Sequence, residues 1–281
     1  MAERVLLVVN PEAGSFDDAF RASCEKAAPE AKIGTIDDLP KEPWDVVVAC
    51  GGDGTVRLVV NALVKAESEA ALGIVPLGTA NVIARALGLP KEPEEALGIA
   101  VGTEERRIDV GICHGEAFLL GCGLGLAERF VTTVGHDEKA KLGPIAYLKK
   151  LLEERKSPPV EFQVEGPKST MTLAGVGLIV ANMAQLGPSV RPMKEVSPED
   201  GRLALILIRH AGLLDMVRLG LRGLFGHAEK DSALDLIPIE QCRISSRPKV
   251  PIQIDGDAVE QEAPFEFSVL PSWLRVRVPQ A

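Results

Sequence analysis

The sequence lacks the excess of basic residues that nucleic-acid binding requires. Its 31 Lys and Arg residues are outnumbered by 40 Asp and Glu, so the formal net charge is −9. A nucleic-acid-binding protein concentrates Lys and Arg on one face or along one helix, and no such cluster is seen here. We therefore expect no nucleic-acid partner. The acidic balance favours a soluble cytoplasmic enzyme.

Paired cysteines are also lacking. The five cysteines are odd in number and widely spaced, without a Cys-x-x-Cys pair, and stand at Cys24, Cys50, Cys113, Cys122 and Cys242. This pattern indicates neither a disulfide framework nor a zinc site. The cysteines are expected to be reduced thiols.

Long hydrophobic runs are absent as well. The first residues, MAERVLLVVNP, offer only about six apolar side chains, too few for a signal peptide or a membrane span. The uncharged stretch Ser169 to Val190 has the length of a span but contains glycines, a proline and polar amides. It is expected to hold a buried strand followed by a loop.

What the chain does have is an alternation of short Val-rich runs and amphipathic segments over its first hundred residues. The 281 residues and the hydrophobic content of 46% are sufficient for two domains with sizeable cores. The alternation predicts a parallel sheet covered by helices on both faces. Strands are expected at 4–9, 45–49 and 72–76, and helices at 17–28, 56–64 and 81–87.

Three polar loops rich in small residues follow these strands, at 10–14, 51–55 and 77–81. Ligands of parallel sheets bind beyond the carboxyl ends of the strands, where such loops share one rim. Glycine lets backbone N–H groups approach a ligand closely, and the N-terminus of the following helix favours an anion. The loops therefore predict a nucleotide phosphate site.

The loop Gly51 to Thr55 contains a carboxylate, Asp53, among its glycines. A carboxylate repels a bare phosphate, so Asp53 is expected either to face a divalent cation such as Mg²⁺ or to handle a proton. A plain strand-to-helix turn is the alternative for this segment taken alone.

Beyond residue 101 the pattern changes to short β runs with one helix at 143–153. We expect an ATP-binding α/β domain at 1–107 and a β-rich, antiparallel substrate domain at 108–281, whose last strand could return to the first domain. A cleft between them would be the natural substrate site. The predicted strands lie at 108–112, 117–121, 160–164, 171–180, 203–208, 237–245, 252–255, 265–270 and 274–278.

Taken together, these motifs resemble those of the diacylglycerol kinase catalytic-domain family, which includes bacterial diacylglycerol kinase-like proteins and sphingosine and ceramide kinases. The resemblance runs from end to end of the chain. It rests on NPEAG at 10–14, GGDGT at 51–55, PLGTAN at 76–81 with Arg85, IDVG at 108–111, LGPIAYL at 142–148, PEDGRL at 198–203 and IDGD at 254–257. It implies an N-terminal three-layer nucleotide-binding domain, a C-terminal β-sandwich-like domain, ATP, Mg²⁺ and phosphorylation of a lipid hydroxyl.

The resemblance also assigns a nucleotide site. Residues expected to hold or line ATP are Asn10, Gly51, Gly52, Gly54, Thr55, Gly78, Thr79 and Asn81. For Thr79 a helix N-cap is the alternative role, and for Arg85 an ordinary surface charge.

Catalysis is assigned to two carboxylates. Asp257 is expected to be the general base that deprotonates the acceptor hydroxyl, at a position where the family usually has Glu. The Asp-Gly turn of a β-hairpin is the alternative reading of that segment. Asp53 is expected to organise Mg²⁺ and ATP, with Asp109 and Asp200 as further metal candidates. A simple turn is the alternative for Asp200.

The chain departs from the family pattern at three places. Val82 stands where an Asp often follows the Gly-Thr-Ala-Asn motif, NPEAG lacks a Ser before its glycine, and the glycine-rich run before PEDGRL is reduced to Leu186-Gly187-Pro188. Two alternatives therefore stay open: a catalytically silent relative that binds lipid or nucleotide, and a kinase of a soluble hydroxyl compound.

The expected partner is a lipid substrate of phospholipid metabolism, met by transient contact at the inner face of a membrane. The segments 143–156 and 213–225 could dock on an anionic surface or simply pack on their own domain. A homodimer is a further open expectation.

Overall fold

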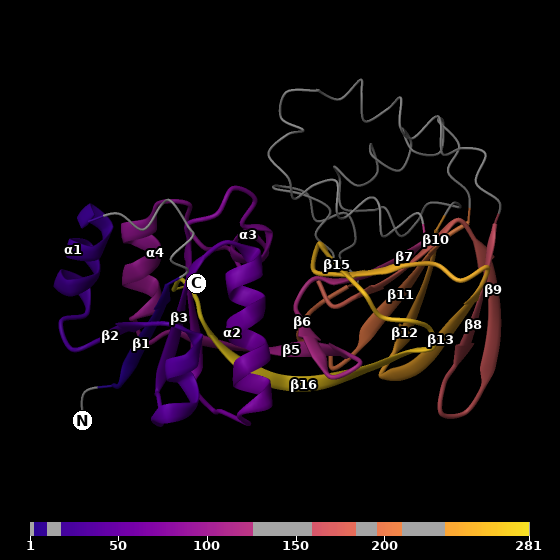
Figure 1. Cartoon of the computed structure of the whole chain (residues 1–281), viewed down its shortest axis with the longest axis horizontal. Helices are drawn as coiled ribbons and strands as arrows, with labels where there is room; N and C mark the ends of the chain where they lie inside the picture. Colours follow the sequence, from indigo (N-terminus) through magenta and orange to yellow (C-terminus); the bar gives the residue numbers. More distant parts are fainter. Residues whose placement is uncertain (1–2, 10–17, 126–158, 184–195, 210–233, 281) are drawn as a thin grey trace, which may run out of the picture. The chain divides into compact units, whose positions relative to one another are not determined.

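The computed structural model describes residues 3–9, 18–125, 159–183, 196–209 and 234–280 (Figure 1). The chain divides into a first unit, residues 1–110 with 271–281, and a second unit, residues 111–270. The division lies at residue 110, where the sequence predicted 107. Two strands cross it, β5 (Glu105–Cys113) and β16 (Phe265–Arg277).

The first unit is built on parallel strands. β1 (Val5–Val9) pairs with β2 (Lys32–Gly34) and β3 (Val46–Gly51), and β3 pairs with β4 (Ala71–Pro76). The C-terminal end of β16 joins this sheet in parallel through Val276 and Leu72. β3 and β4 are buried along their whole length, as expected for strands covered on both faces.

Helices cover both faces of this sheet, as Figure 1 shows: α1 (Asp18–Ala27) and α4 (Pro93–Ala100) lie on one side, and α2 (Asp53–Lys65) and α3 (Val82–Ala86) on the other. Alternate residues of β3, Val46, Val48 and Cys50, pack in one cluster with Phe20 of α1 and Leu97 of α4. The predicted three-layer α/β architecture is confirmed.

One helix boundary and three short elements of the first unit differ from prediction. Helix α2 begins at Asp53 rather than Val56, because Gly52 serves as its N-cap and accepts the N–H groups of Thr55 and Val56. The segment expected as a loop is therefore largely the first helical turn. The elements β2, the 3₁₀ helix η1 (Ile36–Lys41) and α4 lacked a strong sequence signal because they are short.

The second unit contains an antiparallel sheet of its own and the antiparallel part of the ten-stranded sheet to which β1–β4 also belong. β12 (Leu234–Ile239), β11 (Leu203–Ile208), β10 (Gly177–Ala181), β7 (Gly121–Gly125), β14 (Ile252–Ile254) and β15 (Asp257–Val259) form one sheet in that order. In the other, the N-terminal end of β16 pairs with β13 (Gln241–Arg247), which pairs with β8 (Val160–Glu165) and then β9 (Thr170–Gly175), and β6 (Glu116–Phe118) pairs with β5.

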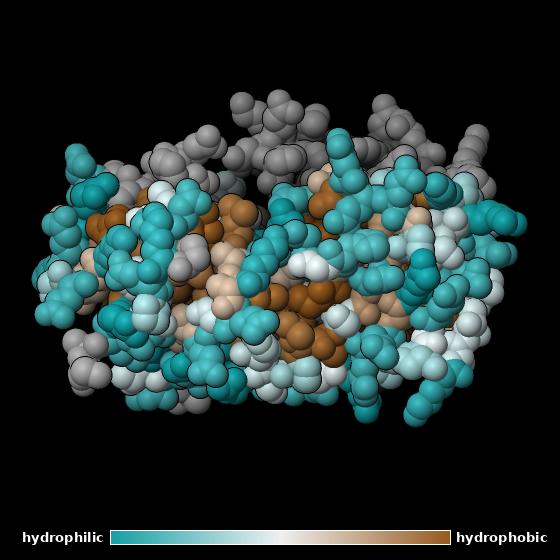
Figure 2. Space-filling view, turned by 60° about the horizontal axis from the view of Figure 1, so that its bottom comes forward, coloured by the Kyte–Doolittle hydropathy of each residue, from teal (hydrophilic) through white to brown (hydrophobic). Residues whose placement is uncertain are grey.

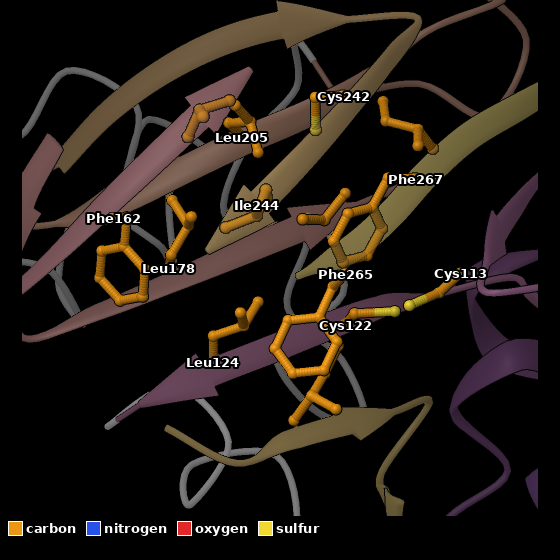
Figure 3. Packing of buried hydrophobic residues seen from close by; sticks show 14 of the residues in the cluster. Cys113, Cys122, Leu124, Phe162, Leu178, Leu205, Cys242, Ile244, Phe265 and Phe267 are labelled. Carbon is orange, nitrogen blue, oxygen red and sulfur yellow. The ribbon is translucent and has the colours of Figure 1, made fainter. Parts of the chain in front are cut away.

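Side chains of both sheets meet in one core. Phe162, Ile244 and Phe265 of one sheet share a buried cluster with Leu124 and Leu178 of the other (Figure 3). Burial of this apolar area is the main force that holds the sheets together. The predicted β-rich antiparallel domain is confirmed.

Three strand predictions in the second unit were wrong in detail. The run 171–180 is two strands that separate at Val176, and 237–245 is two strands that separate at Glu240. Conversely, the runs 265–270 and 274–278 are one strand, β16. Apolar runs carry no information about sheet membership, which depends on the partner strand.

Candidate functional site

Close contacts surround Gly51 and Gly52, which stand between β3 and α2, whereas an added Cβ at Gly54 would meet nothing within 4 Å. A methyl group at Gly51 would collide with the side chain of Thr55, which is therefore buried against this backbone. Gly52 is the N-cap of α2, and Gly54 is exposed in the first helical turn. The backbone at the start of the 13-residue helix α2 is thus left open to a ligand.

The two glycine loops of the first unit touch through their backbones. A Cβ added to Gly78 would lie 2.5 Å from Cα of Gly52, so any side chain there would push the loops apart. The loop after β4 is thereby held against the N-terminus of α2. The sequence predicted that both loops share one rim, and this contact shows how closely they approach.

Asn81 braces the second loop from within. Its Oδ1 accepts the N–H of Gly78 at 3.0 Å, and its Nδ2 donates to the carbonyl oxygens of Gly78 at 2.6 Å and Pro76 at 3.3 Å. Asn81 also occupies the left-handed conformation, with φ 46°, as the N-cap of α3. The N-cap alternative for Thr79 is therefore wrong. Thr79 is exposed, and Arg85 donates to the carbonyl oxygen of Asn81 at 3.3 Å.

Asp53 joins the loops by a contact that the sequence did not reveal. Its carboxylate accepts the N–H of Val82 at 3.0 Å and that of Ile83 at 2.8 Å, at the start of α3. Bonds from N–H groups to a carboxylate are charge-assisted and stronger than neutral ones. Asp53 is half-buried, and an ionised carboxylate has about four acceptor positions, so two contacts do not exhaust its capacity.

Asp109 is in a different environment. It is fully buried in β5, and its Oδ1 accepts the N–H of Ser272 at 2.6 Å. Ser272 has φ 48°, so this contact holds β16 at a residue with unusual backbone geometry. In the structure, Asp109 thus anchors β16, the strand by which the chain returns to the first unit.

Asp257 lies at the start of β15 and is exposed. It pairs with Ile254 across a two-residue turn formed by Asp255, φ 47°, and Gly256, φ 97°. Positive φ at both central residues is typical of the tight turns of β-hairpins, so the hairpin reading of IDGD is confirmed. A hairpin tip is compatible with a catalytic carboxylate, because it presents the side chain on a fixed backbone.

Asp200 lies in an exposed turn before β11. Its Oδ1 accepts the N–H of Arg202 at 2.9 Å, and Gly201 has φ 74°. These contacts are those of a simple turn, the alternative that the sequence left open for this segment. Asn10 and the segments 143–156 and 213–225 lie outside the described residues.

Within those described ranges, no three His, Cys, Asp or Glu side chains form a group that could hold a metal ion. Asp53, Asp109 and Asp200 therefore do not form one protein cage. Nucleotide-bound Mg²⁺ commonly uses only one or two carboxylates, with the remaining ligands supplied by phosphates and water. A single half-buried carboxylate beside two glycine loops, as at Asp53, fits that mode.

The cysteines are not candidate nucleophiles. All five are buried and free. Burial raises the pKa of the Cys24 thiol to about 11 and that of Cys242 to about 12, and it raises the pKa of Cys50 further. A thiol with a raised pKa is protonated at neutral pH and unreactive.

Few large hydrophobic side chains are strongly exposed in the described part of the chain. Hydrophilic residues dominate the view in Figure 2, and Leu58 on α2, 58% exposed, is the large hydrophobic side chain that the described residues expose. In the described part of the chain, no helix has both the length and the apolar character needed to cross a membrane.

Comparison with known proteins identifies both units. Residues 4–113 match the family model of the diacylglycerol kinase catalytic domain, and residues 127–278 match that of the YegS C-terminal NAD kinase beta sandwich-like domain. A YegS-like probable lipid kinase of Chromohalobacter salexigens is 30% identical over 237 residues, which cover 83% of this chain and 76% of that protein. A diacylglycerol kinase of Bacillus subtilis is 29% identical over 220 residues, which cover 76% of this chain and 71% of that protein.

Solved structures agree on the fold. A diacylglycerol kinase of Bacillus anthracis superposes with a TM-score of 0.78 at 24% identity, over 99% of this chain and 97% of the other. An NAD kinase of Archaeoglobus fulgidus, solved in complex with ATP, superposes with a TM-score of 0.53 at 12% identity. The superposition covers 98% of this chain and 93% of the NAD kinase chain.

Two residues with clear local roles were not singled out from the sequence. Asp255 accepts three backbone N–H groups, and Asn182, fully buried, donates to the carbonyl oxygen of Leu119. Asp255 had a signal, an Asp-Gly pair in a motif of the family. Asn182 had none, because a single Asn after an apolar run gives no indication of its partner.

Proposed function

Because this chain belongs to the diacylglycerol kinase catalytic-domain family of lipid kinases, we propose that it is a Mg²⁺-dependent ATP:lipid kinase. It transfers the γ-phosphoryl group of ATP to a hydroxyl of diacylglycerol or a related lipid. The observation that carries the proposal is the backbone contact of the two glycine loops, with Asp53 bonded to both residues that open α3.

The two loops bind the phosphates of ATP. Backbone N–H groups at the start of α2 and the positive end of its dipole favour the negative charge, and Gly54 and Thr79 are exposed to receive it. Thr55 keeps the backbone of Gly51 close, and Asn81 keeps the loop after β4 in shape. Asn10, which lies outside the described residues, is proposed as a further nucleotide residue by its match to the family motif. A rigid cradle reduces the ordering cost of binding.

Asp53 would hold the Mg²⁺ that accompanies ATP. Charge neutralisation on the phosphoryl oxygens is the chemistry that a Mg²⁺ bound there would supply. The hydrogen bonds that the Asp53 carboxylate accepts from the backbone N–H groups of Val82 and Ile83 keep it in one orientation. Val82 itself offers only a buried apolar side chain, so it contributes no second carboxylate. Asp109 and Asp200 remain proposed metal residues at other positions.

Asp257 acts as the general base. It accepts the proton of the lipid hydroxyl while the hydroxyl oxygen forms its bond to the γ-phosphorus and the bond to the bridging oxygen of ADP breaks. The carboxylate is exposed, as a group that must reach a substrate requires. Positioned bases contribute about 10²- to 10⁴-fold to rate, so Asp257→Asn should lower kcat by about that factor.

A labelling experiment tests the activity. The purified protein is incubated with γ-labelled ATP, Mg²⁺ and vesicles made from a mixed lipid extract, and the labelled products are separated and identified. A labelled phospholipid that disappears when Mg²⁺ is chelated supports the proposal. Binding of ATP without labelled lipid would identify a silent relative, and label on a water-soluble alcohol would identify a different substrate class.

The protein meets its lipid by transient contact with the inner face of the membrane. Sedimentation with anionic and neutral vesicles measures this. Weak, salt-sensitive binding to anionic vesicles is expected, whereas equal binding to both kinds would contradict an electrostatic contact.

A further inference from the structure

Four hydrogen bonds connect Asp255 to the short backbone segment Leu119 to Gly121. Its Oδ2 accepts the N–H of Leu119 at 2.8 Å, and its Oδ1 accepts those of Leu120 and Gly121, each at 2.9 Å. Its own N–H donates to the carbonyl oxygen of Gly121 at 2.9 Å. The residue is 9% exposed, so these bonds lie almost entirely away from water.

The segment Leu119 to Gly121 is fixed from its other side as well. The side chain of Asn182 donates to the carbonyl oxygen of Leu119 at 3.0 Å, and the backbone N–H groups of Asn182 and Met183 donate to that of Leu120 at 2.9 and 3.1 Å. Both the donors and the acceptors of this segment are thereby satisfied. It forms a rigid support at the junction of β6, β7 and β10.

The hairpin that carries Asp257 is attached to this support. β14 pairs with β7 through Ile254 and Cys122, and Asp255 continues the attachment into the turn. Gln253 closes the turn from inside, because its Oε1 accepts the N–H of Gly256 at 2.7 Å. Every residue from Ile252 to Gly256 is therefore held before the chain reaches Asp257.

We propose that Asp255 is a positioning residue for Asp257: its carboxylate, bonded to the backbone of Leu119 to Gly121, places the hairpin tip so that Asp257 meets the acceptor hydroxyl. This inference rests on the proposed function. A carboxylate is required because it only accepts hydrogen bonds, whereas an amide would turn an N–H₂ group toward one of the three N–H donors. A displacement of about 1 Å at a reacting group can cost about 100-fold in rate.

A double-mutant cycle tests the proposal. Asp255→Asn, Asp257→Asn and the double variant are assayed for lipid phosphorylation with labelled ATP. Asp255→Asn is expected to lower kcat about 10- to 100-fold with the KM for ATP unchanged. In the Asp257→Asn background it should lower kcat less than twofold, because the group that it positions is already lost.

The controls separate positioning from general damage. Asp235→Asn changes another carboxylate of the second unit, which pairs with Arg209 at 2.6 Å, and should leave kcat unchanged. If Asp255→Asn does not fold, Gln253→Met, which removes the side-chain amide that accepts the Gly256 N–H, enters the same cycle. Near-normal kcat in the variant used, a parallel rise of the KM for ATP, or additive losses in the double variant would overturn the proposal.

The same data test the proposed function separately. If Asp257→Asn keeps normal activity, the assignment of the base is wrong. If Asp257→Asn is inactive while the Asp255 variant behaves like wild type, the base stands and only the positioning role fails.

Discussion

Asp53 and Asp255 each use both carboxylate oxygens to hold backbone N–H groups of a neighbouring segment. Asp53 holds Val82 and Ile83, and Asp255 holds Leu119 to Gly121. Both lie in motifs that the sequence marked as chemical. A carboxylate that is oriented by charge-assisted hydrogen bonds keeps one geometry, which catalysis and metal binding both require.

Asp53→Asn is expected to abolish lipid phosphorylation. The amide loses the negative charge and can accept only one of the two N–H groups, so it should also reduce stability by about 0.5–2 kcal/mol, as the loss of a helix cap does. Turnover should fall more than about 100-fold, well beyond the effect on folding. Labelled-ATP assays and thermal melts are compared with Asp37→Asn, an exposed carboxylate in η1. Near-normal turnover would refute the metal role.

The buried thiol of Cys24 makes stability depend on alkaline pH. Burial raises its pKa from 9.0 to about 11, so between these values the unfolded chain ionises the thiol and the native protein does not. The stability due to this group is thus complete below pH 9 and is lost as pH rises toward 11. Urea midpoints of wild type and Cys24→Ala at several pH values test this. A decline as steep in the variant would assign it to other groups.

At the scale of elements, the site of the first unit is a contact between two strand-to-helix connections. β3 leads into α2 and β4 leads toward α3, and the connections meet at Gly52 and Gly78. Asp53 and Asn81 then fasten the start of α3, which has only five residues and needs such support. The cradle is therefore a property of the packed pair of connections and not of either loop.

Gly78→Ala should separate the two connections. Its methyl carbon would lie 2.5 Å from Cα of Gly52, a backbone atom, so the backbones of the two connections would have to move apart. Overpacking of this kind costs about 1–3 kcal/mol, and we expect ATP affinity to fall about tenfold or more. Calorimetric titration with ATP measures it.

Gly98→Ala in α4 is the matched control for this variant. Nothing lies within 4 Å of the added methyl group, and the change should stabilise the helix by about 0.5–1 kcal/mol. Equal ATP affinity in the two variants would contradict the close approach of the loops.

At the scale of the whole molecule, the last residues of the chain complete the sheet of the first unit. Arg277 of β16 is 1% exposed and pairs with Glu3 at 2.8 Å and with Glu105 at 3.3 Å. Arg275 pairs with Glu105 at 2.8 Å. The beginning and the end of the chain are thus joined by ion pairs around a buried guanidinium.

Arg277→Ala should destabilise the first unit by about 3–5 kcal/mol, because removal of one partner of a buried pair leaves its network uncompensated. The two tryptophans, Trp44 and Trp273, both belong to this unit, so their fluorescence reports its unfolding in urea. Lys249→Ala removes an exposed pair with Glu262 and should cost less than about 1 kcal/mol. Similar losses in both variants would show that burial of Arg277 contributes little.

The amino-acid sequence alone is sufficient to predict the fold class and the order of the glycine-bearing loops. Alternating Val-rich strands and amphipathic helices predict a parallel sheet, and glycine-bearing loops at 51–55 and 77–81 then share a rim for topological reasons. GGDGT, PLGTAN and IDGD carry local signals of close backbone approach and tight turns, which depend on neighbours in the chain.

The contacts of these residues became known from the three-dimensional structure. It paired Asp53 with the N–H groups of Val82 and Ile83, Asp255 with Leu119 to Gly121, and Arg277 with Glu3. It also divided the run 171–180 between two sheets and merged two runs into β16. Periodicity reports which face of an element is buried, whereas partners distant in sequence are set by packing, so a pattern along the chain cannot name them.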